Sequence, residues 1–224
     1  RAVPRVHANE LDGFRGAVLR RVLSPGASIT SHDAEFIDDL LGAEVQPSLV
    51  LMNPPFASSA ARSEDPTIAL RHAISAAKRL APGGRLVAIL PPNASGAGQA
   101  DLWRRFTGFV QPVARLVLPR SAFAKIGTSI ETHLLVAEKR LPGSDQSGAS
   151  VIQRMVSSPA EAMVLLADGL PERLECIHDL PLPVTSRAQS PVSRPVSLPA
   201  AQPAPRSPGM LLPRRSPLAA RLPA

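Results

Sequence analysis

The chain has a single cysteine, Cys176, among its 224 residues, which excludes an internal disulfide. No stretch reaches the roughly 18 consecutive apolar residues of a membrane-spanning helix. The N-terminus also has none of the charged-then-apolar layout of a signal peptide. We therefore expect no membrane partner and a cytoplasmic location.

Acidic residues are absent after Asp179, and aromatic residues are absent from Pro181 onward. Proline, serine, alanine and arginine dominate there, a composition that buries too little apolar surface to offset the entropy of ordering, so residues 181–224 are predicted to form a disordered tail. Two roles remain open for it: an electrostatic tether to nucleic acid, or a solvated or frame-shifted extension without function. Six arginines in the tail account for six of the seven net positive charges of the chain: Arg187, Arg194, Arg206, Arg214, Arg215 and Arg221.

The tetrapeptide Asn53-Pro54-Pro55-Phe56 directly follows the apolar run 49–52. A buried strand that ends in Asn and two prolines places the Asn at the carboxyl edge of a sheet, where open α/β folds bind ligands. The Asn53 amide and the Pro54 carbonyl are acceptors for an amino group, and Phe56 offers an aromatic plane for stacking. The alternative is that these residues only form a turn that closes the strand.

The surrounding pattern alternates strands and helices. The first four strands predicted alternate with helices, which favours parallel pairing with right-handed crossovers. The last two have no long helix between them, so we expect them to pair antiparallel. Ala81-Pro82-Gly83-Gly84 is predicted to stop a helix before a buried strand. Strands are predicted near 4–9, 27–31, 47–52, 84–90, 113–119 and 130–137, and helices near 12–23, 34–41, 65–80, 99–109 and 159–169.

In this setting the chain resembles the S-adenosylmethionine-dependent amino-methyltransferases, whose signature is Asn or Asp, Pro, Pro, then an aromatic residue. It is similar in particular to the methyltransferase-like domain of strawberry-notch-type proteins, over residues 3–140. The resemblance implies an α/β fold, a Rossmann-like class I methyltransferase sheet with an antiparallel edge hairpin, and S-adenosyl-L-methionine as cofactor. It rests on the stretches HANELD, HDAEFIDDLL, PSLVLMNPPF, LAPGGRLVAILPPN and GTSIETHLLVAEK.

One departure from that family concerns the glycine-rich loop after its first strand, which has no counterpart here. The first predicted strand corresponds to the second strand of the family, so we expect an N-terminally truncated domain that lacks its first strand and loop. The predicted organisation is a partial methyltransferase domain (1–140), a linker with a short helical extension (141–180) and the tail (181–224). Other domains of a larger parent chain are expected as partners.

The acids that end the first two strands are the predicted cofactor ligands. Glu10 would accept hydrogen bonds from the ribose hydroxyls, with helix capping by Asp12 or Asn9 as the rival explanation. The resemblance implies that Asp33 accepts from the adenine amino group and that the Ala34 amide meets a ring nitrogen. The rival is that Asp33 caps the following helix.

The predicted catalytic residues are Asn53, Pro54, Pro55 and Phe56, and three functions remain open. The first is methylation of adenine N6, with DNA as partner. The second is methylation of another amine or amide, in RNA or on a protein glutamine. The third is a non-catalytic scaffold, because without the glycine-rich loop we expect the 224 residues alone to bind the cofactor too weakly for turnover.

Overall fold

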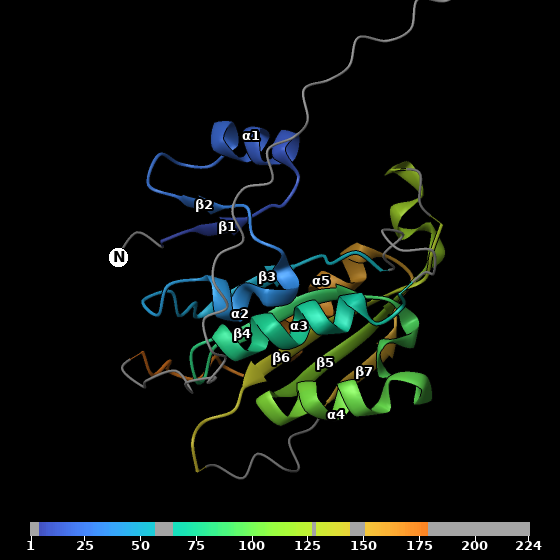
Figure 1. Ribbon diagram of the computed structural model, residues 1–224. Coiled ribbons are helices and arrows are strands. Elements are labelled where there is room, and N and C mark those ends of the chain that lie inside the picture. The colour runs from blue at the N-terminus through green and yellow to red at the C-terminus, as the bar shows by residue number, and fades with distance from the viewer. Residues whose placement is uncertain (1–4, 57–64, 127–128, 144–150, 179–224) are drawn as a thin grey trace, which may run out of the picture. The chain divides into compact units, whose positions relative to one another are not determined.

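The computed structural model describes residues 5–56, 65–126, 129–143 and 151–178 (Figure 1). The chain divides into two units, 1–185 and 186–224, and the second unit lies outside the described residues together with the rest of the predicted tail. None of the described helices is long and apolar enough to cross a membrane.

The strands form two separate sheets. Parallel strands β1 (His7–Asn9) and β2 (Ser28–Thr30) make the smaller one and are connected by helix α1 (Gly13–Val22). The larger sheet has the strand order β3-β4-β6-β5-β7. Its strands are β3 (Leu49–Met52), β4 (Arg85–Leu90), β5 (Val110–Leu118), β6 (Thr132–Lys139) and β7 (Ile152–Met155).

Helices cover both faces of the larger sheet, because apolar side chains alternate along its strands. Leu86 and Ala88 of β4 pack in the core that includes α3 and α4, whereas Val87 packs with the core that includes α5. The helices are α3 (Ile68–Arg79), α4 (Ala100–Phe109) and α5 (Pro159–Gly169). Short 3-10 and α-helical turns complete the chain: η1 (Ala34–Phe36), α2 (Ile37–Leu40), η2 (Pro92–Ser95), η3 (Ala97–Gln99) and η4 (Arg120–Ile126).

The parallel and antiparallel pairing predicted from the sequence is confirmed, but the β5–β6 hairpin does not form the edge of the sheet, because β7 pairs with β5. β1 pairs with β2, and β3 with β4, in parallel, while β5 and β6 pair antiparallel. The predicted helix over 34–41 is divided into η1 and a single α-helical turn. Strand β7 was not predicted, because three of its four residues are exposed and its sequence lacks alternation; parallel pairing with β5 makes it a strand.

The segment that follows α5 runs along the amino ends of β3 and β4. The Arg173 guanidinium donates to the Ser48 carbonyl (2.9 Å), and the Ile177 amide donates to the Pro82 carbonyl (3.1 Å). Gly83 turns here with φ +78°, as the Pro-Gly-Gly stretch predicted. The carboxyl ends of the same strands are therefore left at the opposite edge of the sheet.

Candidate active site at the carboxyl edge

The predicted site residues follow the carboxyl ends of consecutive strands. Glu10 follows β1, Asp33 lies three residues after β2, and Asn53 follows β3. These ends point toward the right-hand side of Figure 1. The carboxyl ends of β1 and β2 share one edge of the smaller sheet, and the carboxyl end of β3, in the larger sheet, faces the same side of the view.

The Asn9 side chain joins the ends of β1 and β2 through hydrogen bonds that together form the Asn9 clasp. Asn9 Nδ2 donates to the His32 carbonyl and Asn9 Oδ1 accepts from the His32 amide, both at 2.9 Å. The Thr30 hydroxyl also donates to Asn9 Oδ1 (2.9 Å). Glu10 directly follows Asn9, and Asp33 directly follows His32. The bonds of Asn9 therefore fix the backbone positions of the two acidic residues relative to each other.

Glu10 is held by its own turn. Its Oε1 accepts from the Asp12 amide (2.8 Å) and from the Arg15 guanidinium (3.0 Å), and the bond from Arg15 is the main reason why the pKa of Glu10 is lowered. The cap of α1 is Asp12, which accepts from the Arg15 amide at 2.8 Å. Both hydrogen bonds to Glu10 are accepted by Oε1. Capping of α1 by Asp12 is therefore compatible with a Glu10 carboxylate that also accepts a hydrogen bond from a hydroxyl group.

Asp33 caps η1 with a bond from the Glu35 amide to Oδ1 (3.0 Å), and its side chain is 50% exposed. Ala34 is the first residue of η1. The imidazole Nε2 of His72, on α3, lies 3.9 Å from Asp33 Oδ1. Burial lowers the pKa of His72, and Asp33 and Glu35 oppose that shift only in part, so the imidazole is predominantly neutral at pH 7.

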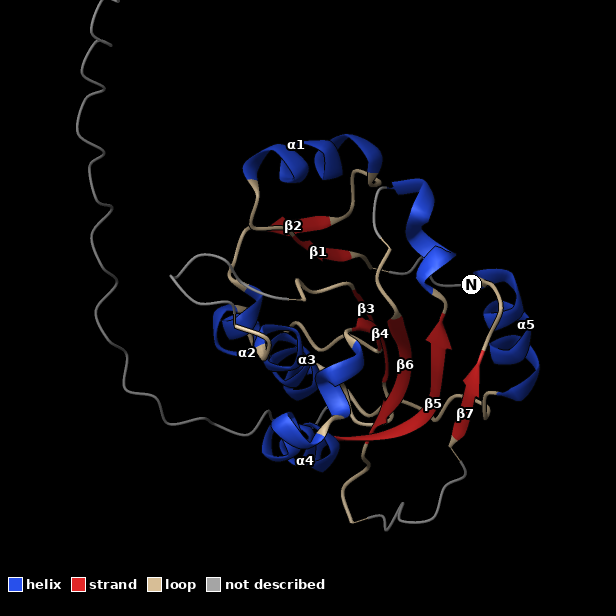
Figure 2. Cartoon of the chain, turned by 90° about the vertical axis from the view of Figure 1, so that its right-hand side faces the viewer, coloured by secondary structure: helices blue, strands red, loops and turns tan. Residues whose placement is uncertain are grey.

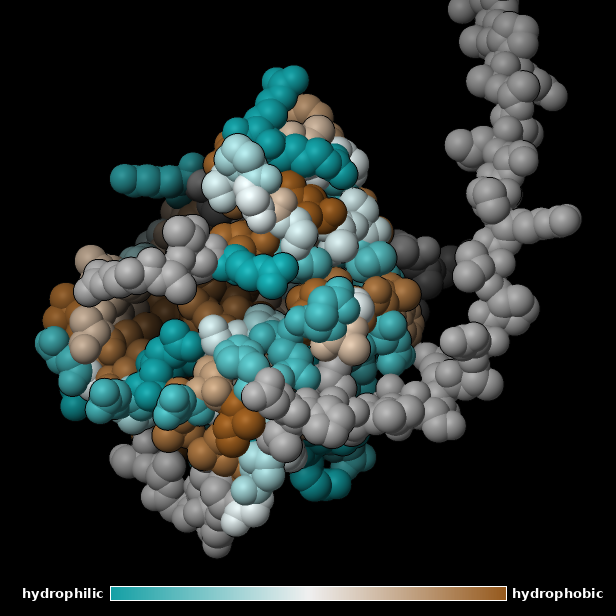
Figure 3. Space-filling model, turned by 90° about the vertical axis from the view of Figure 1, so that its left-hand side faces the viewer, coloured by the Kyte–Doolittle hydropathy of each residue, from teal (hydrophilic) through white to brown (hydrophobic). Residues whose placement is uncertain are grey.

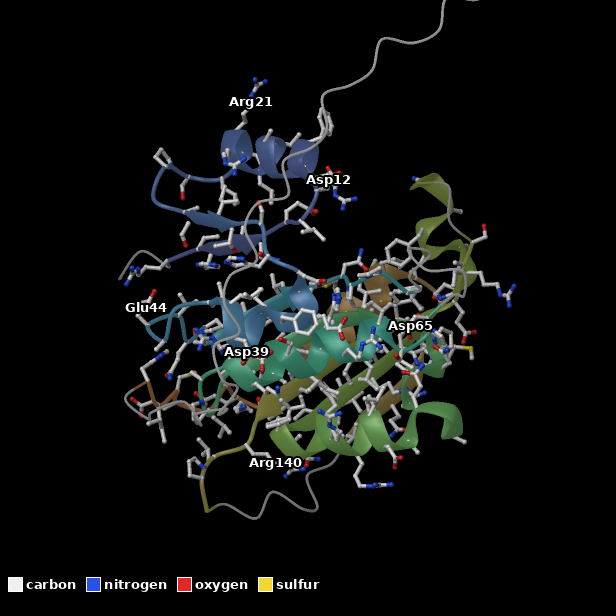
Figure 4. All side chains as sticks on the ribbon, viewed as in Figure 1. Asp12, Arg21, Asp39, Glu44, Asp65 and Arg140 are labelled. Carbon is white, nitrogen blue, oxygen red and sulfur yellow. The ribbon has the colours of Figure 1, made fainter. Side chains whose placement is uncertain are left out.

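Arg71 makes two ion pairs that join η1 to the start of α3. The sequence did not indicate them. Arg71 Nε lies 2.9 Å from Glu35 Oε1, and Arg71 Nη2 lies 2.6 Å from Asp65 Oδ2. Figure 4 shows Asp65 at the start of α3 and Asp12 at the start of α1, both toward the same side of the view. The spacing of Glu35 and Arg71 does not predict their contact, since they lie 36 residues apart on η1 and α3.

The four residues of the Asn-Pro-Pro-Phe motif differ in exposure. Asn53 and Pro55 are exposed, Pro54 is buried, and Phe56 is half-buried. Within the described residues the Asn53 side chain makes no hydrogen bond. The register of β3 with β4 pairs Met52 with Ala88, which places Asn53 just beyond the last paired residue. Among the described residues, the motif therefore presents an amide without a hydrogen-bond partner at the carboxyl end of β3.

Beside the motif, β4 is followed by Pro91, which is buried, and by the exposed residues Pro92 and Asn93. A small hollow lies beneath η2, and none of the predicted site residues lines it. Its His133 is 7% exposed, and burial lowers the pKa of this imidazole. The hollow is lined by Leu90, Ala94, Ser95, Trp103, Arg115, His133 and Leu135.

Several solved structures are similar to this chain in fold. A protein of Listeria monocytogenes assigned to the class I S-adenosylmethionine-dependent methyltransferases matches 73% of this chain with a TM-score of 0.53 and 14% sequence identity. The modification subunit assigned to a type I restriction enzyme of Vibrio vulnificus matches 74% with a TM-score of 0.53 and 16% identity. A type I restriction-modification complex matches 69% with a TM-score of 0.51 and 17% identity.

The protein therefore has the Rossmann-like class I methyltransferase fold, as the sequence predicted. The chain covers 54% of the Listeria protein and 41% of the Vibrio subunit, so it spans about half the length of these structures or less. No family model matches the chain, and no curated protein matches it.

Proposed function

We propose that this chain belongs to an enzyme that methylates an exocyclic amino group with S-adenosyl-L-methionine as methyl donor, and that adenine N6 in DNA is the target. The observation that carries the proposal is Asn53, an exposed amide at the end of β3 without a hydrogen-bond partner among the described residues. Two carboxylates, Glu10 and Asp33, follow the carboxyl ends of the parallel strands β1 and β2 of the smaller sheet.

The residues present suit the cofactor. Glu10 has a lowered pKa, so it is ionised at neutral pH and accepts hydrogen bonds from ribose hydroxyls. The Asp33 carboxylate, on a half-exposed side chain, would accept a hydrogen bond from the adenine amino group. The amide of Ala34 would donate a hydrogen bond to a ring nitrogen. The cofactor supplies an electrophilic methyl group; the remaining work falls to the protein.

That work is positioning and electrostatic stabilisation. The Asn53 amide oxygen and the Pro54 carbonyl would accept the two hydrogens of the target amine, which draws the nitrogen lone pair out of conjugation with the ring. Phe56 would stack on the base, with a contribution of about 1–3 kcal/mol. No general base is needed beforehand, because the methylated amine loses its proton readily. A base in a duplex must first flip out of the helix.

DNA is the proposed partner for two reasons. The chain shares its fold with the modification subunit assigned to a type I restriction enzyme of Vibrio vulnificus, and the arginines after Asp179 offer positive charge to phosphates. Since the motif contacts only an amino group, RNA bases and protein glutamine remain within its chemistry.

A specific observation favours a second candidate, a non-catalytic scaffold. The carboxylates of Glu10 and Asp33 are both engaged in turns or caps, and the sequence has no glycine-rich loop to approach the cofactor. A chain without such a loop would bind S-adenosylmethionine weakly or not at all.

Calorimetry and a radiolabel transfer assay test these proposals. The 224-residue chain should show little cofactor binding, and a family-type strand and loop fused ahead of Arg1 should restore it. In the fused protein, Asn53→Ala should reduce transfer to adenine-containing DNA by at least about 100-fold while leaving cofactor affinity unchanged. Asp33→Ala should weaken cofactor binding first. Asn93→Ala, another exposed amide near the same edge, is the control.

Full activity of Asn53→Ala on adenine-containing DNA would show that the motif is only a turn. Tight cofactor binding by the unmodified chain would show that no loop is missing. A fused protein that binds cofactor but transfers no methyl group to DNA, RNA or protein glutamine would favour the scaffold.

A further inference from the structure

The segment 102–130 contains no acidic residue, although it makes up most of α4, all of β5 and the turn η4. Its cations are Arg104, Arg105, Arg115, Arg120 and Lys125. Such a stretch forms either a solvated face or a surface for a negatively charged partner. The contacts that these cations make within the protein decide between the two.

Cations near the amino ends of the strands serve the fold. Lys139 ends β6 beside the amino end of β4, and its ammonium donates to the Ala77 carbonyl of α3. Arg79 donates to the carbonyls of Leu41 and Gly42, at the end of α2. Figure 3 views the molecule from the side opposite the carboxyl ends, where hydrophobic and hydrophilic side chains are interspersed. These cations are held by backbone carbonyls and are not available to a partner.

Arg115 differs from the other arginines that are buried or half-buried. Its side chain has neither a hydrogen bond nor an ion pair within the part of the chain that the structure describes. A guanidinium carries five N–H donors, which are costly to bury without acceptors. Oxygens from outside the protein therefore have to satisfy these donors. The arginines of similar burial that do have acceptors in the chain are Arg71, Arg79, Arg85 and Arg140.

The register of β5 places Arg115 on the face of the larger sheet that α4 covers in part. It pairs with Leu135, which lies in the core that includes α4, and with Gln153 of β7. Side chains directly opposite each other on paired strands share a face. Arg115 and Trp103 of α4 line the same hollow, whereas Gln153 is exposed. In Figure 2, α4 and α5 lie on opposite sides of this sheet, so Arg115 faces away from α5.

Arg120 and Lys125 lie on η4, which in Figure 2 continues from the arrowhead of β5 away from the sheet. The turn packs through Ala122 and Phe123 against the core that includes α5, and both cations are exposed. Neither has an acceptor among the described residues. At a rise of about 3.3 Å per residue, Arg115 lies about 10 Å before the carboxyl end of β5. The three cations therefore follow one strand to its end.

Glu131, directly before β6, is the acid that borders these cations. Its Oε1 lies 3.7 Å from His133 Nε2. In the described ranges no ion pair joins Glu131 to a cation of β5 or η4. The positive charge at the end of β5 is thus not neutralised by a direct partner.

Charge is divided between the two sides of Asn53. Glu10 and Asp33 follow the strands of the smaller sheet, whereas Arg120 and Lys125 follow β5. In the order β3-β4-β6-β5, three spacings of about 4.8 Å, or about 14 Å, separate β3 from β5. About four nucleotides of one DNA strand rise by the same distance. A strand whose base reaches Asn53 can therefore place its phosphates at the end of β5.

We propose that Arg115, Arg120 and Lys125 bind the phosphate backbone of DNA and form a β5 cation surface beside the candidate active site. The choice of DNA rests on the proposed function, because adenine in DNA is the target proposed for Asn53. Arg115 offers a planar fork to phosphate oxygens, and Lys125 acts as a point charge. Contacts of this kind position a strand and supply affinity, without reading its sequence.

Fluorescence anisotropy of the full 224-residue chain with a labelled duplex tests the surface over a salt series. The combined variant Arg115→Gln, Arg120→Gln and Lys125→Gln should lower the affinity at least about tenfold at low salt. The slope of log K against log salt should become shallower by about 0.9 for each phosphate contact that is lost.

The matched control removes the same charge from the other end of the folded part. Arg5, Arg20 and Arg21 are exposed and also lack an acceptor among the described residues. Figure 4 shows Arg21 pointing outward from α1. The combined variant Arg5→Gln, Arg20→Gln and Arg21→Gln should leave the salt slope close to that of the wild type. Equal losses in the two combined variants would overturn the proposal, since only net charge would then matter.

Two single substitutions separate phosphate binding by Arg115 from a structural role. Arg115→Gln should leave the urea midpoint unchanged, because the guanidinium has no acceptor in the described chain. Arg115→Lys should keep the salt slope but weaken the affinity, because the fork is lost while the charge stays. A clear fall of the midpoint in Arg115→Gln, or an affinity unchanged in both variants, would contradict the assignment of Arg115.

Competition identifies the partner. A polyglutamate peptide of equal charge should displace the labelled duplex less well than unlabelled duplex DNA does. Equal displacement would assign the surface to acidic proteins, and tighter binding of duplex RNA through the same three residues would overturn the choice of DNA. These readouts do not involve methyl transfer. A β5 cation surface that binds DNA while the fused protein transfers no methyl group would leave this inference standing and the proposed function refuted, and the reverse result would separate them equally.

Discussion

Asn9 and His32 are joined by two reciprocal hydrogen bonds of 2.9 Å: Asn9 Nδ2 donates to the His32 carbonyl, and the His32 amide donates to Asn9 Oδ1. The side chain thereby continues the pairing of β1 with β2 beyond its last backbone contact, in which the Glu10 amide donates to the Thr30 carbonyl (3.0 Å). The relative position of Glu10 and Asp33 depends on this contact.

Asn9→Ala should lower the free energy of unfolding by about 1–3 kcal/mol, because three partly buried bonds are lost and the His32 backbone is left unsatisfied. Asn9→Asp keeps the acceptor for the Thr30 hydroxyl but loses the donor to the His32 carbonyl, so its cost should be intermediate. Urea denaturation measures both. An Asn9→Ala variant as stable as Asn93→Ala would show that the clasp contributes nothing.

Gly83 and Gly143 form a matched pair for a second prediction. Both have positive φ, at +78° and +72°, so alanine is strained at either position. A Cβ on Gly83 would lie 2.6 Å from the Glu175 carbonyl oxygen, whereas one on Gly143 meets nothing within 4 Å. Gly83→Ala should therefore destabilise the protein more than Gly143→Ala, by about 1 kcal/mol or more.

Thermal melts compare the two glycine variants, and limited proteolysis reports where the strain is relieved. Because the clash is with backbone, Gly83→Ala should also expose the segment around Arg173 to trypsin. Equal melting temperatures and equal cleavage in the two variants would mean that residues 170–178 do not pack against this turn in solution.

Lys139 gives a prediction for pH. Its ammonium donates to the Ala77 carbonyl (2.6 Å) and lies 5.1 Å from the centre of the Phe109 ring, yet burial outweighs these contacts and lowers its pKa from 10.5 to about 8. The folded state therefore binds fewer protons than the unfolded state between about pH 8 and 10.5. Lys139 should make stability rise with pH across this window, on the order of 1 kcal/mol per unit, and its full cost should be present below pH 8.

Chemical denaturation at several pH values checks the direction. Lys139→Met should remove the rise between pH 8 and 10.5, while Lys125→Met, at an exposed lysine, should retain it. A wild-type stability that falls through this window in step with Lys139→Met would show that the ammonium is not desolvated.

The arginines after Asp179 support a prediction about nucleic acid. Deleting residues 181–224 removes six positive charges without any acid, so nonspecific affinity for duplex DNA should fall and its salt dependence should flatten. Fluorescence anisotropy over a salt series measures both. An unchanged salt slope would locate the phosphate contacts elsewhere in the chain.

The sequence by itself determined the local elements at the candidate site. An apolar run ending in Asn-Pro-Pro terminates as a strand, because proline cannot continue a ladder. Helix α3 ends at Arg79, ahead of Pro82, and Gly83 then turns the chain with a positive φ. Parallel and antiparallel pairing also followed from whether helices separate the strands. These are properties of neighbouring residues.

Only the tertiary structure decided what depends on distant residues. Strand β7 exists because β5 offers it an edge. The Asn9 clasp and the ion pair of Arg71 with Glu35 join segments more than 20 residues apart. The sequence of β3 is apolar throughout and predicts a strand that is buried on both faces. It does not reveal that the strands divide into two sheets or that Leu51 is exposed. Burial depends on what packs against a face, and a strand's own sequence does not contain its neighbour.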